Sequence, residues 1–315
     1  MNKLSKPVSV IPIITYQSRL FISHFTISIK LKGFFFTSSI NGFLYVWNIK
    51  FQFPIFQNFY KNHHFIFINI NKKSNLLVTS SNNMQILLLK INGYSNINNM
   101  NICTISKNTF RTLFTYLKFS ENDKLFLCGF RIILWDVLQC KSKNIIAKSS
   151  KKIKKIILNK LYKNLMIYYS EKQIYFDDYK YLSNLRKINL NNRVTNLEWY
   201  SMMSGLIFVS TKNSNIFLFD LRNLLNPIQK IKLKKIIPTI DFFNFSYSNK
   251  ILLISSNNVK KITIVKIKNF EFLKAHVIQI QNILIKYKKI HSQNWISLNK
   301  YNDITLWKIL YNDFS

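Results

Sequence analysis

The chain has 315 residues, of which 48% are hydrophobic and 15% aromatic, so it can bury a large core, and chain-wide disorder is excluded. Its 46 Lys and Arg residues oppose only 12 Asp and Glu residues, and the formal net charge of +34 favours nucleic acid or an acidic protein as a partner. Only six of the basic residues are Arg, and the abundance of Lys, Asn and Ile is also typical of an AT-rich genome, so composition leaves the origin of the charge open.

Cysteine usage and the apolar runs restrict the compartment. Cys103, Cys128 and Cys140 have no spacing typical of a zinc site or a disulfide framework, which predicts free thiols in a reducing, intracellular compartment. No apolar run reaches the roughly 18 residues that a membrane span needs. The N-terminal segment is basic and then apolar, but Pro12 interrupts it and no small-residue cleavage site follows. Residues 7–16 are therefore predicted to form a β-strand.

A strand–turn–strand pattern follows and recurs along the chain. In SINGFLYVWNIK, residues 39–50, the turn residues Asn41 and Gly42 precede an apolar strand that contains Trp47. Six later segments align with it: NMQILLLKI, GFRIILWDV, EKQIYFDDY, NSNIFLFDL, VKKITIVKI and YNDITLWKI. The equivalent positions are 42, 46, 42, 42, 46 and 42 residues apart, and the repeats end near residues 49, 91, 137, 179, 221, 267 and 309. This period is typical of the four-stranded blades of a β-propeller.

The repeats predict an all-β chain and a set of core residues. Segments rich in Ile, Phe, Val and Tyr alternate with Asn-containing turns, and no segment has a sustained helical period with caps. We expect the aligned apolar residues to be buried between neighbouring blades; they are Trp47, Leu89, Trp135, Phe219, Val265 and Trp307. Asp177 has the same position in the fourth repeat, where it is either a substitution in a degenerate blade or a buried functional acid.

Four repeat ends resemble the repeat of the WD-repeat family: YVWNI at 45–49, ILWDV at 133–137, LFDLRN at 218–223 and TLWKI at 305–309. The resemblance covers essentially the whole chain. It implies a single domain, residues 1–315, folded as a seven-bladed β-propeller of four-stranded antiparallel blades that an N-terminal strand closes. It also implies a structural network of His, Ser or Thr, Trp and Asp. His64 and His276 are expected at the His positions, and Ser39, Ser81 and Ser256 at strand ends.

The sequence contains no nucleophile elbow, glycine-rich phosphate loop or HExxH motif. We therefore expect a protein that is not an enzyme, without a cofactor, a metal or a small-molecule substrate. His63 and His64 are open to two interpretations, a metal-binding pair or loop residues that bond to a neighbouring strand.

Lysines gather after the third and fifth repeats and within the sixth. In the family, the crossovers between blades lie on the same face as the turn between the second and third strands, so the resemblance implies that these lysines share one face. The set is Lys148, Lys151, Lys152, Lys154, Lys155, Lys232, Lys234, Lys235, Lys260 and Lys261. They form either a binding face or ordinary solvated loops. Clusters of Lys without Arg favour attraction to the phosphate backbone of RNA and not recognition of its bases.

Asp220 and Arg222 resemble the motif by which some propellers dock on a ubiquitin-ligase adaptor, and a purely structural loop is the other interpretation. Two functions stay open. The first is a non-catalytic scaffold that binds other proteins of a multisubunit complex in the nucleus or nucleolus, as in ribosome biogenesis or splicing, and contacts RNA backbone. The second is a chromatin-associated, histone-binding-like propeller or a ubiquitin-ligase adaptor that binds peptides, with the charge arising from composition.

Overall fold

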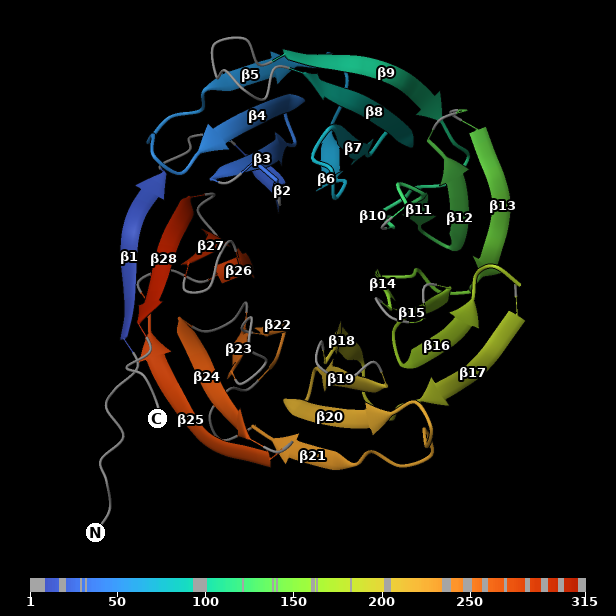
Figure 1. Ribbon diagram of the computed structural model, residues 1–315, viewed down its shortest axis with the longest axis vertical. Coiled ribbons are helices and arrows are strands. Elements are labelled where there is room, and N and C mark those ends of the chain that lie inside the picture. The colour runs from blue at the N-terminus through green and yellow to red at the C-terminus, as the bar shows by residue number, and fades with distance from the viewer. Residues whose placement is uncertain are drawn as a thin grey trace.

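The protein is a ring of small β-sheets, with the N-terminal strand beside the last strand of the chain (Figure 1). The computed structural model describes residues 9–16, 21–28, 30–31, 33–92, 101–120, 122–137, 139, 141–159, 162, 164–181, 183–200, 205–233, 239–245, 251–256, 260–268, 271–280, 284–289, 294–299 and 303–310. These residues form strands, turns and loops. None of them belongs to a helix with the length and apolar character of a membrane span.

The strands form seven four-stranded sheets, the blades, each with an innermost strand near the centre of the ring and an outermost strand at its rim. From the inside outward, blade 1 contains β2 (Ile22–Ile27), β3 (Phe34–Ser39), β4 (Phe43–Asn48) and β5 (Phe56–Phe59). Blade 2 contains β6 (Phe65–Ile70), β7 (Leu76–Ser81), β8 (Gln85–Asn92) and β9 (Asn101–Thr109). Blade 3 contains β10 (Tyr116–Phe119), β11 (Leu125–Cys128), β12 (Arg131–Asp136) and β13 (Lys141–Lys148). Blade 4 contains β14 (Lys155–Leu158), β15 (Leu165–Tyr169), β16 (Gln173–Asp178) and β17 (Ser183–Asn189).

The remaining blades complete the ring. Blade 5 contains β18 (Val194–Trp199), β19 (Leu206–Thr211), β20 (Asn215–Asp220) and β21 (Gln229–Lys232). Blade 6 contains β22 (Phe242–Phe245), β23 (Ile251–Ser255), β24 (Lys261–Lys268) and β25 (Glu271–Gln279). Blade 7 contains β26 (Leu284–Lys289), β27 (Asn294–Asn299), β28 (Ile304–Leu310) and β1 (Ser9–Tyr16). Six blades therefore consist of consecutive strands, and blade 7 combines strands from both ends of the chain.

Strand β1 closes the ring as the outermost strand of blade 7. It pairs antiparallel with β28, from Ser9 opposite Leu310 to Tyr16 opposite Ile304. Pro12 has no N–H to donate, and it is tolerated because β1 is an edge strand with an irregularity between Pro12 and Ile14. The predicted all-β propeller, closed by an N-terminal strand, is confirmed.

The repeated Trp-equivalent position lies in the third strand of every blade, opposite one fixed position of the second strand. The pairs are Trp47 with Phe35, Leu89 with Leu77, Trp135 with Leu125, Asp177 with Met166, Phe219 with Ile207, Val265 with Leu252 and Trp307 with Trp295. The sequence period therefore corresponds to one structural register, although the hairpins of blades 3, 4 and 6 differ in length from the other four.

The hydrophobic core lies between neighbouring blades. Trp135 of blade 3 packs with Val78 and Leu88 of blade 2, and Trp47 of blade 1 packs with Leu298 of blade 7. Leu89, Phe219 and Val265 are also buried, with at most 2% of each residue exposed. Each large third-strand side chain thus joins two sheets, and burying one such side chain stabilises the fold by about 1.5–3 kcal/mol.

Two expectations on the repeat do not hold. Trp307 is only partly buried, unlike Trp47 and Trp135 in the same register, although its indole nitrogen still donates to Ser297 Oγ at 2.7 Å. His276 lies within β25, opposite Ile264, and not in a crossover, because β25 is nine residues long and extends to Gln279.

Candidate binding face

One face of the ring is built from the blade-to-blade crossovers and the turns between second and third strands, and we call it the crossover face. Backbone hydrogen bonds hold the two kinds of loop together. The N–H of Ile40 donates to Phe21 O at 2.9 Å, and the N–H of Lys212 donates to Arg193 O at 2.8 Å. The loops on the other edge of each blade make their own bonds, such as that from the N–H of Leu221 to Gly205 O at 2.8 Å, and they form the opposite face.

Blades 3 to 5 carry a group of cationic side chains on the crossover face, which we call the basic arc. It comprises Lys151, Lys152 and Lys154 of the crossover from β13 to β14, Lys172 and Lys212 of two hairpin turns, and Arg193 of the crossover from β17 to β18. All are exposed except Lys154, which is half-buried. The loops of the crossover face that the structure describes contain three acids, Glu171, Asp241 and Asp303, so positive charge prevails there.

Interactions within the basic arc link its crossovers to its turns. Lys151 Nζ donates to Glu171 Oε2 at 2.6 Å, and this hydrogen bond, together with the charge of Lys151, holds the pKa of the Glu171 carboxyl below its usual value. Burial lowers the pKa of the Lys154 ammonium, and the positive charge of Arg193 lowers it further. Loop ends from three blades therefore lie close enough to interact, and an added anion would relieve the repulsion between Lys154 and Arg193.

Lys155, a member of the predicted basic clusters, has a different role. It begins the innermost strand β14, and its Nζ donates to Asn196 Oδ1 and to Leu197 O, both at 2.8 Å. The same ammonium forms an ion pair with Glu198. All three acceptors belong to β18, so Lys155 joins blades 4 and 5 and is not available to a phosphate.

The other predicted lysines are distributed around the crossover face. Lys148 and Lys232 are exposed at the ends of the outer strands β13 and β21. Lys260 is exposed in the turn of blade 6, and Lys261 begins β24 and is half-buried. Lys234 and Lys235 lie outside the described residues.

In blades 1, 4 and 5, the residue after the Trp-equivalent position has a structural function at the opposite face. The side-chain oxygens of Asn48, Asp178 and Asp220 accept the N–H two residues further on, at 2.9, 2.8 and 2.9 Å. Such local bonds satisfy the backbone where the third strand turns toward the fourth. Arg222 donates from Nε and Nη2 to the same Asp220 carboxylate, with a shortest distance of 2.6 Å. Asp220 and Arg222 therefore bond to each other, which favours the structural interpretation over docking.

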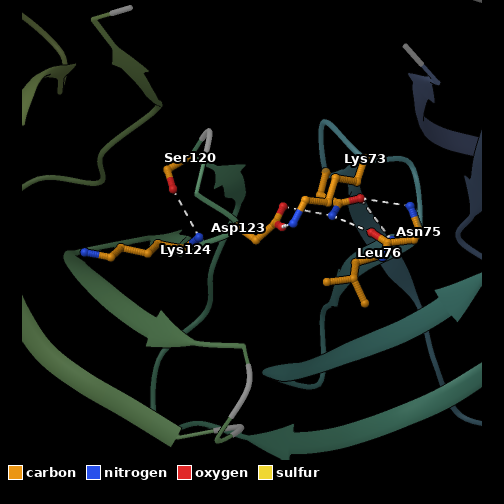
Figure 2. Close-up of polar contacts among 7 residues, drawn as sticks. Lys73, Asn75, Leu76, Ser120, Asp123 and Lys124 are labelled. Atoms are coloured by element: carbon orange, nitrogen blue, oxygen red, sulfur yellow. Dashed lines mark hydrogen bonds and ion pairs between the residues drawn. The ribbon is translucent and has the colours of Figure 1, made fainter. Parts of the chain in front are cut away.

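Acids at the opposite face also pair with lysines between blades. Figure 2 shows Asp123 of the β10–β11 loop beside Lys73 of the β6–β7 loop, at 2.9 Å. The same carboxylate accepts a hydrogen bond from Asn71 Nδ2 at 2.9 Å. This pairing neutralises the charge of Asp123 and links blades 2 and 3 at the opposite face.

The histidines and Asp177 do not form a chemical site in the described part of the chain. His64 bonds through Nδ1 to Ile40 O at 2.8 Å, and His63 is buried beside it. Among the described residues, no group of three or more His, Cys, Asp or Glu side chains could hold a metal ion. Asp177 is buried and accepts a hydrogen bond from Tyr168 Oη at 2.8 Å, within blade 4 and away from the crossover face. Cys128 is buried and Cys103 exposed, both as free thiols, and Cys140 lies outside the described residues.

Sequence reasoning missed three members of the basic arc: Lys172, Arg193 and Lys212. Each is a single cation in a short polar turn or crossover, and none belongs to a run of lysines. The available signal was their place relative to the repeat: Lys172 and Arg193 each stand directly before a strand, and Lys212 directly follows one. Comparison of the sequence with protein-family models gave no match, and comparison with curated proteins gave none either. The fold is a propeller of four-stranded blades, an architecture typical of non-catalytic interaction scaffolds.

Proposed function

We propose that this chain is a WD-repeat protein that acts as a non-catalytic scaffold in an RNA–protein assembly of the nucleus or nucleolus, such as one for ribosome biogenesis or splicing. Support for the family comes from recurring bonds at the repeat position. Trp47 and Trp307 both donate from the indole nitrogen to a second-strand hydroxyl, of Thr37 at 2.9 Å and of Ser297 at 2.7 Å.

The observation that carries the RNA part of the proposal is the concentration of cations on the crossover face of blades 3 to 5. In the basic arc, six cations from blades 3 to 5 gather around two described acids, Glu171 and Asp241. The described opposite-face loops of the same blades contain three cations, Lys124, Lys180 and Arg222, and Arg222 is paired with Asp220. A composition bias would add lysines to both faces alike, whereas a surface for the phosphate backbone needs them on one.

The peptide-binding alternative, a histone-binding-like or ubiquitin-ligase adaptor propeller, has less support at the residues on which it depends. The Arg222 side chain is 89% exposed, but its guanidinium is bound by Asp220 in the same loop. A partner could use only the guanidinium donors that Asp220 leaves free, those of Nη1 and one of Nη2.

Isolation of the tagged protein from cells, with and without RNase treatment, tests the proposal. We expect a fixed set of RNA-binding proteins that is reduced by RNase, and a further reduction with the variant Lys152→Gln/Lys172→Gln/Lys212→Gln. A partner set of histones or ubiquitin-ligase subunits that RNase leaves unchanged would favour the alternative.

A further inference from the structure

The crossover face has a second sector, on blades 1 to 3, where exposed apolar side chains replace the cations. The hairpin turns of these blades present Ile40, Met84 and Phe130, which are 48%, 42% and 48% exposed, and the crossover before blade 1 adds Phe21, 58% exposed. The corresponding turns of blades 4 to 6 present Lys172, Lys212 and Lys260. We call Phe21, Ile40, Met84 and Phe130 the apolar arc.

The apolar arc is continuous along the loops. Ile40 bonds to Phe21 through its N–H, and Ile40 O accepts from His64, whose own carbonyl accepts from Asn82 at 2.9 Å. The N–H of Phe110 donates to Met84 O at 2.9 Å. These bonds fix the positions of neighbouring turns, so the apolar side chains form a prearranged surface.

Two glycines allow this close packing of loops. A Cβ on Gly42 would lie 2.6 Å from Tyr60 O, and a Cβ on Gly129 would lie 2.4 Å from Leu113 O. Each glycine therefore lets a crossover pass directly against the turn that carries Ile40 or Phe130. The turns of the apolar arc are rigid parts of the fold.

Met84 is in an unfavourable conformation for its residue type. The third position of the three-residue turns has positive φ, 85° at Gly42, 60° at Met84 and 59° at Ser214. Gly and Asn adopt this conformation most readily, and Asn is abundant in this chain. A half-exposed Met at such a position is not explained by packing, and residues kept in such conformations cluster at functional sites.

Charges beside the apolar arc indicate the chemistry of its partner. The crossovers of the same sector carry exposed Lys61 and Arg111, and β12 begins with exposed Arg131. The described loops of this sector contain no Asp or Glu. An apolar surface edged only by cations complements a segment that carries both apolar and acidic side chains.

We propose that the apolar arc binds an acidic segment of a partner protein whose apolar side chains contact Ile40, Met84 and Phe130 while its carboxylates face Lys61 and Arg111. Ile40 and Met84 are 48% and 42% exposed, so part of each side chain packs on the protein and the rest can contact a partner. Only Phe21 and Phe130 could stack on RNA bases, so a protein segment uses more of the surface. This site is distinct from the basic arc, and the two proposals can fail independently.

Selection from a display library of random 12-residue peptides on the immobilised full chain tests the proposal. We expect the enriched peptides to combine Leu, Ile, Phe or Trp with Asp or Glu. The affinity of one enriched peptide, measured by fluorescence anisotropy, should fall at least about tenfold with the variant Ile40→Ser/Met84→Asn/Phe130→Ser. The affinity should fall by a smaller factor with Lys61→Gln/Arg111→Gln. This factor should be larger at low salt than at high salt.

The matched control replaces exposed apolar residues of the opposite face, as Phe53→Ser/Leu225→Ser/Ile228→Ser. This control should leave peptide affinity unchanged, and unchanged thermal melting of both triple variants would show that they fold. Equal loss from both variants would overturn the proposal. So would enrichment of basic peptides. The proposal would also be overturned if the apolar-arc variant lost binding to phosphatidylserine vesicles or to oligouridylate but still bound the peptide. The partner would then be a lipid surface or RNA.

Discussion

Trp47 and Thr37 form a buried hydrogen bond, from indole Nε1 to Oγ1 over 2.9 Å, that joins the third and second strands of blade 1. Trp307 and Ser297 repeat it in blade 7. In blade 2, Leu89 replaces the Trp, and the hydroxyl of Thr79, at the position of Thr37, has no hydrogen-bond partner among the described residues. The two threonines thus occupy equivalent positions. The hydroxyl of Thr37 accepts a hydrogen bond, whereas that of Thr79 has no partner among the described residues.

Replacing each threonine by Val should therefore have different effects. Thr37→Val leaves the buried N–H of Trp47 unpaired and should lower the free energy of unfolding by about 1–3 kcal/mol. Thr79→Val removes a hydroxyl that has no described partner and should be neutral or stabilising. Urea unfolding of both variants measures the difference. Equal losses would show that the Trp–Thr bond contributes nothing.

The turn position shared by Gly42 and Met84 predicts substitutions of opposite sign. Met84→Gly should raise the free energy of unfolding by about 1 kcal/mol, because Met is sterically strained at positive φ. Gly42→Ala should lower it, because the new Cβ would lie 2.6 Å from Tyr60 O and 2.8 Å from His63 O. Thermal unfolding checks both. A destabilised Met84→Gly variant would show that the Met side chain has packing value in the isolated protein.

The fold could be predicted from the sequence because each blade repeats one register. Trp47, Leu89 and Trp135 differ in type but occupy one position of the third strand, so their spacing revealed the blade. The partial exposure of Trp307 and the placement of His276 in β25 could not be predicted, because they depend on how far the outer strand of each blade extends and on what packs against the blade.

Burial of His63 makes stability sensitive to acid. Burial lowers the pKa of His63 below its unfolded value of about 6.5, and the charges of Lys107 and His64 lower it further. The unfolded chain therefore binds the proton more readily, so the stability that neutral His63 contributes is present above about pH 6.5 and is lost as the pH falls through the lowered folded pKa.

The variant His63→Gln should reduce this loss, measured as the urea midpoint between pH 7.5 and pH 5. The same change at His64, whose side chain is exposed, is the control and should leave the loss in place. An unchanged pH dependence in His63→Gln would assign the acid sensitivity to other groups.

Lys155 should contribute to stability and not to phosphate binding. Lys155→Gln removes the ion pair with Glu198 and the bond to Leu197 O, and we expect a loss of roughly 1–3 kcal/mol in the free energy of unfolding. The exposed Lys152, from the same run of lysines, is the control, and its change to Gln should cost almost nothing. Loss of RNA affinity in Lys155→Gln without loss of stability would contradict this assignment.

The basic arc could be predicted only in part, because its membership depends on how the blades pack. The run from Lys151 to Lys155 was visible in the sequence, but the start of β14 at Lys155 turns that side chain toward β18, 42 residues further on, and away from the loop. Arg193 and Lys212 join the basic arc only because the ring brings successive crossovers and turns together. Proximity of this kind depends on blade packing and leaves no local sequence pattern.

The salt dependence of RNA binding tests the central claim most directly. If the basic arc contacts phosphates, the affinity of the protein for a 20-residue oligouridylate should fall steeply with salt, and Lys152→Gln/Lys172→Gln/Lys212→Gln should reduce the slope of log K against log salt by up to about 2, at about 0.7 per lost contact. The matched control changes three exposed lysines of the opposite face, Lys30, Lys50 and Lys124, to Gln and should leave the slope unchanged. A smaller slope for the basic-arc variant alone is the result we predict. Equal changes in both variants, or no change in either, would contradict a phosphate-binding function for the basic arc.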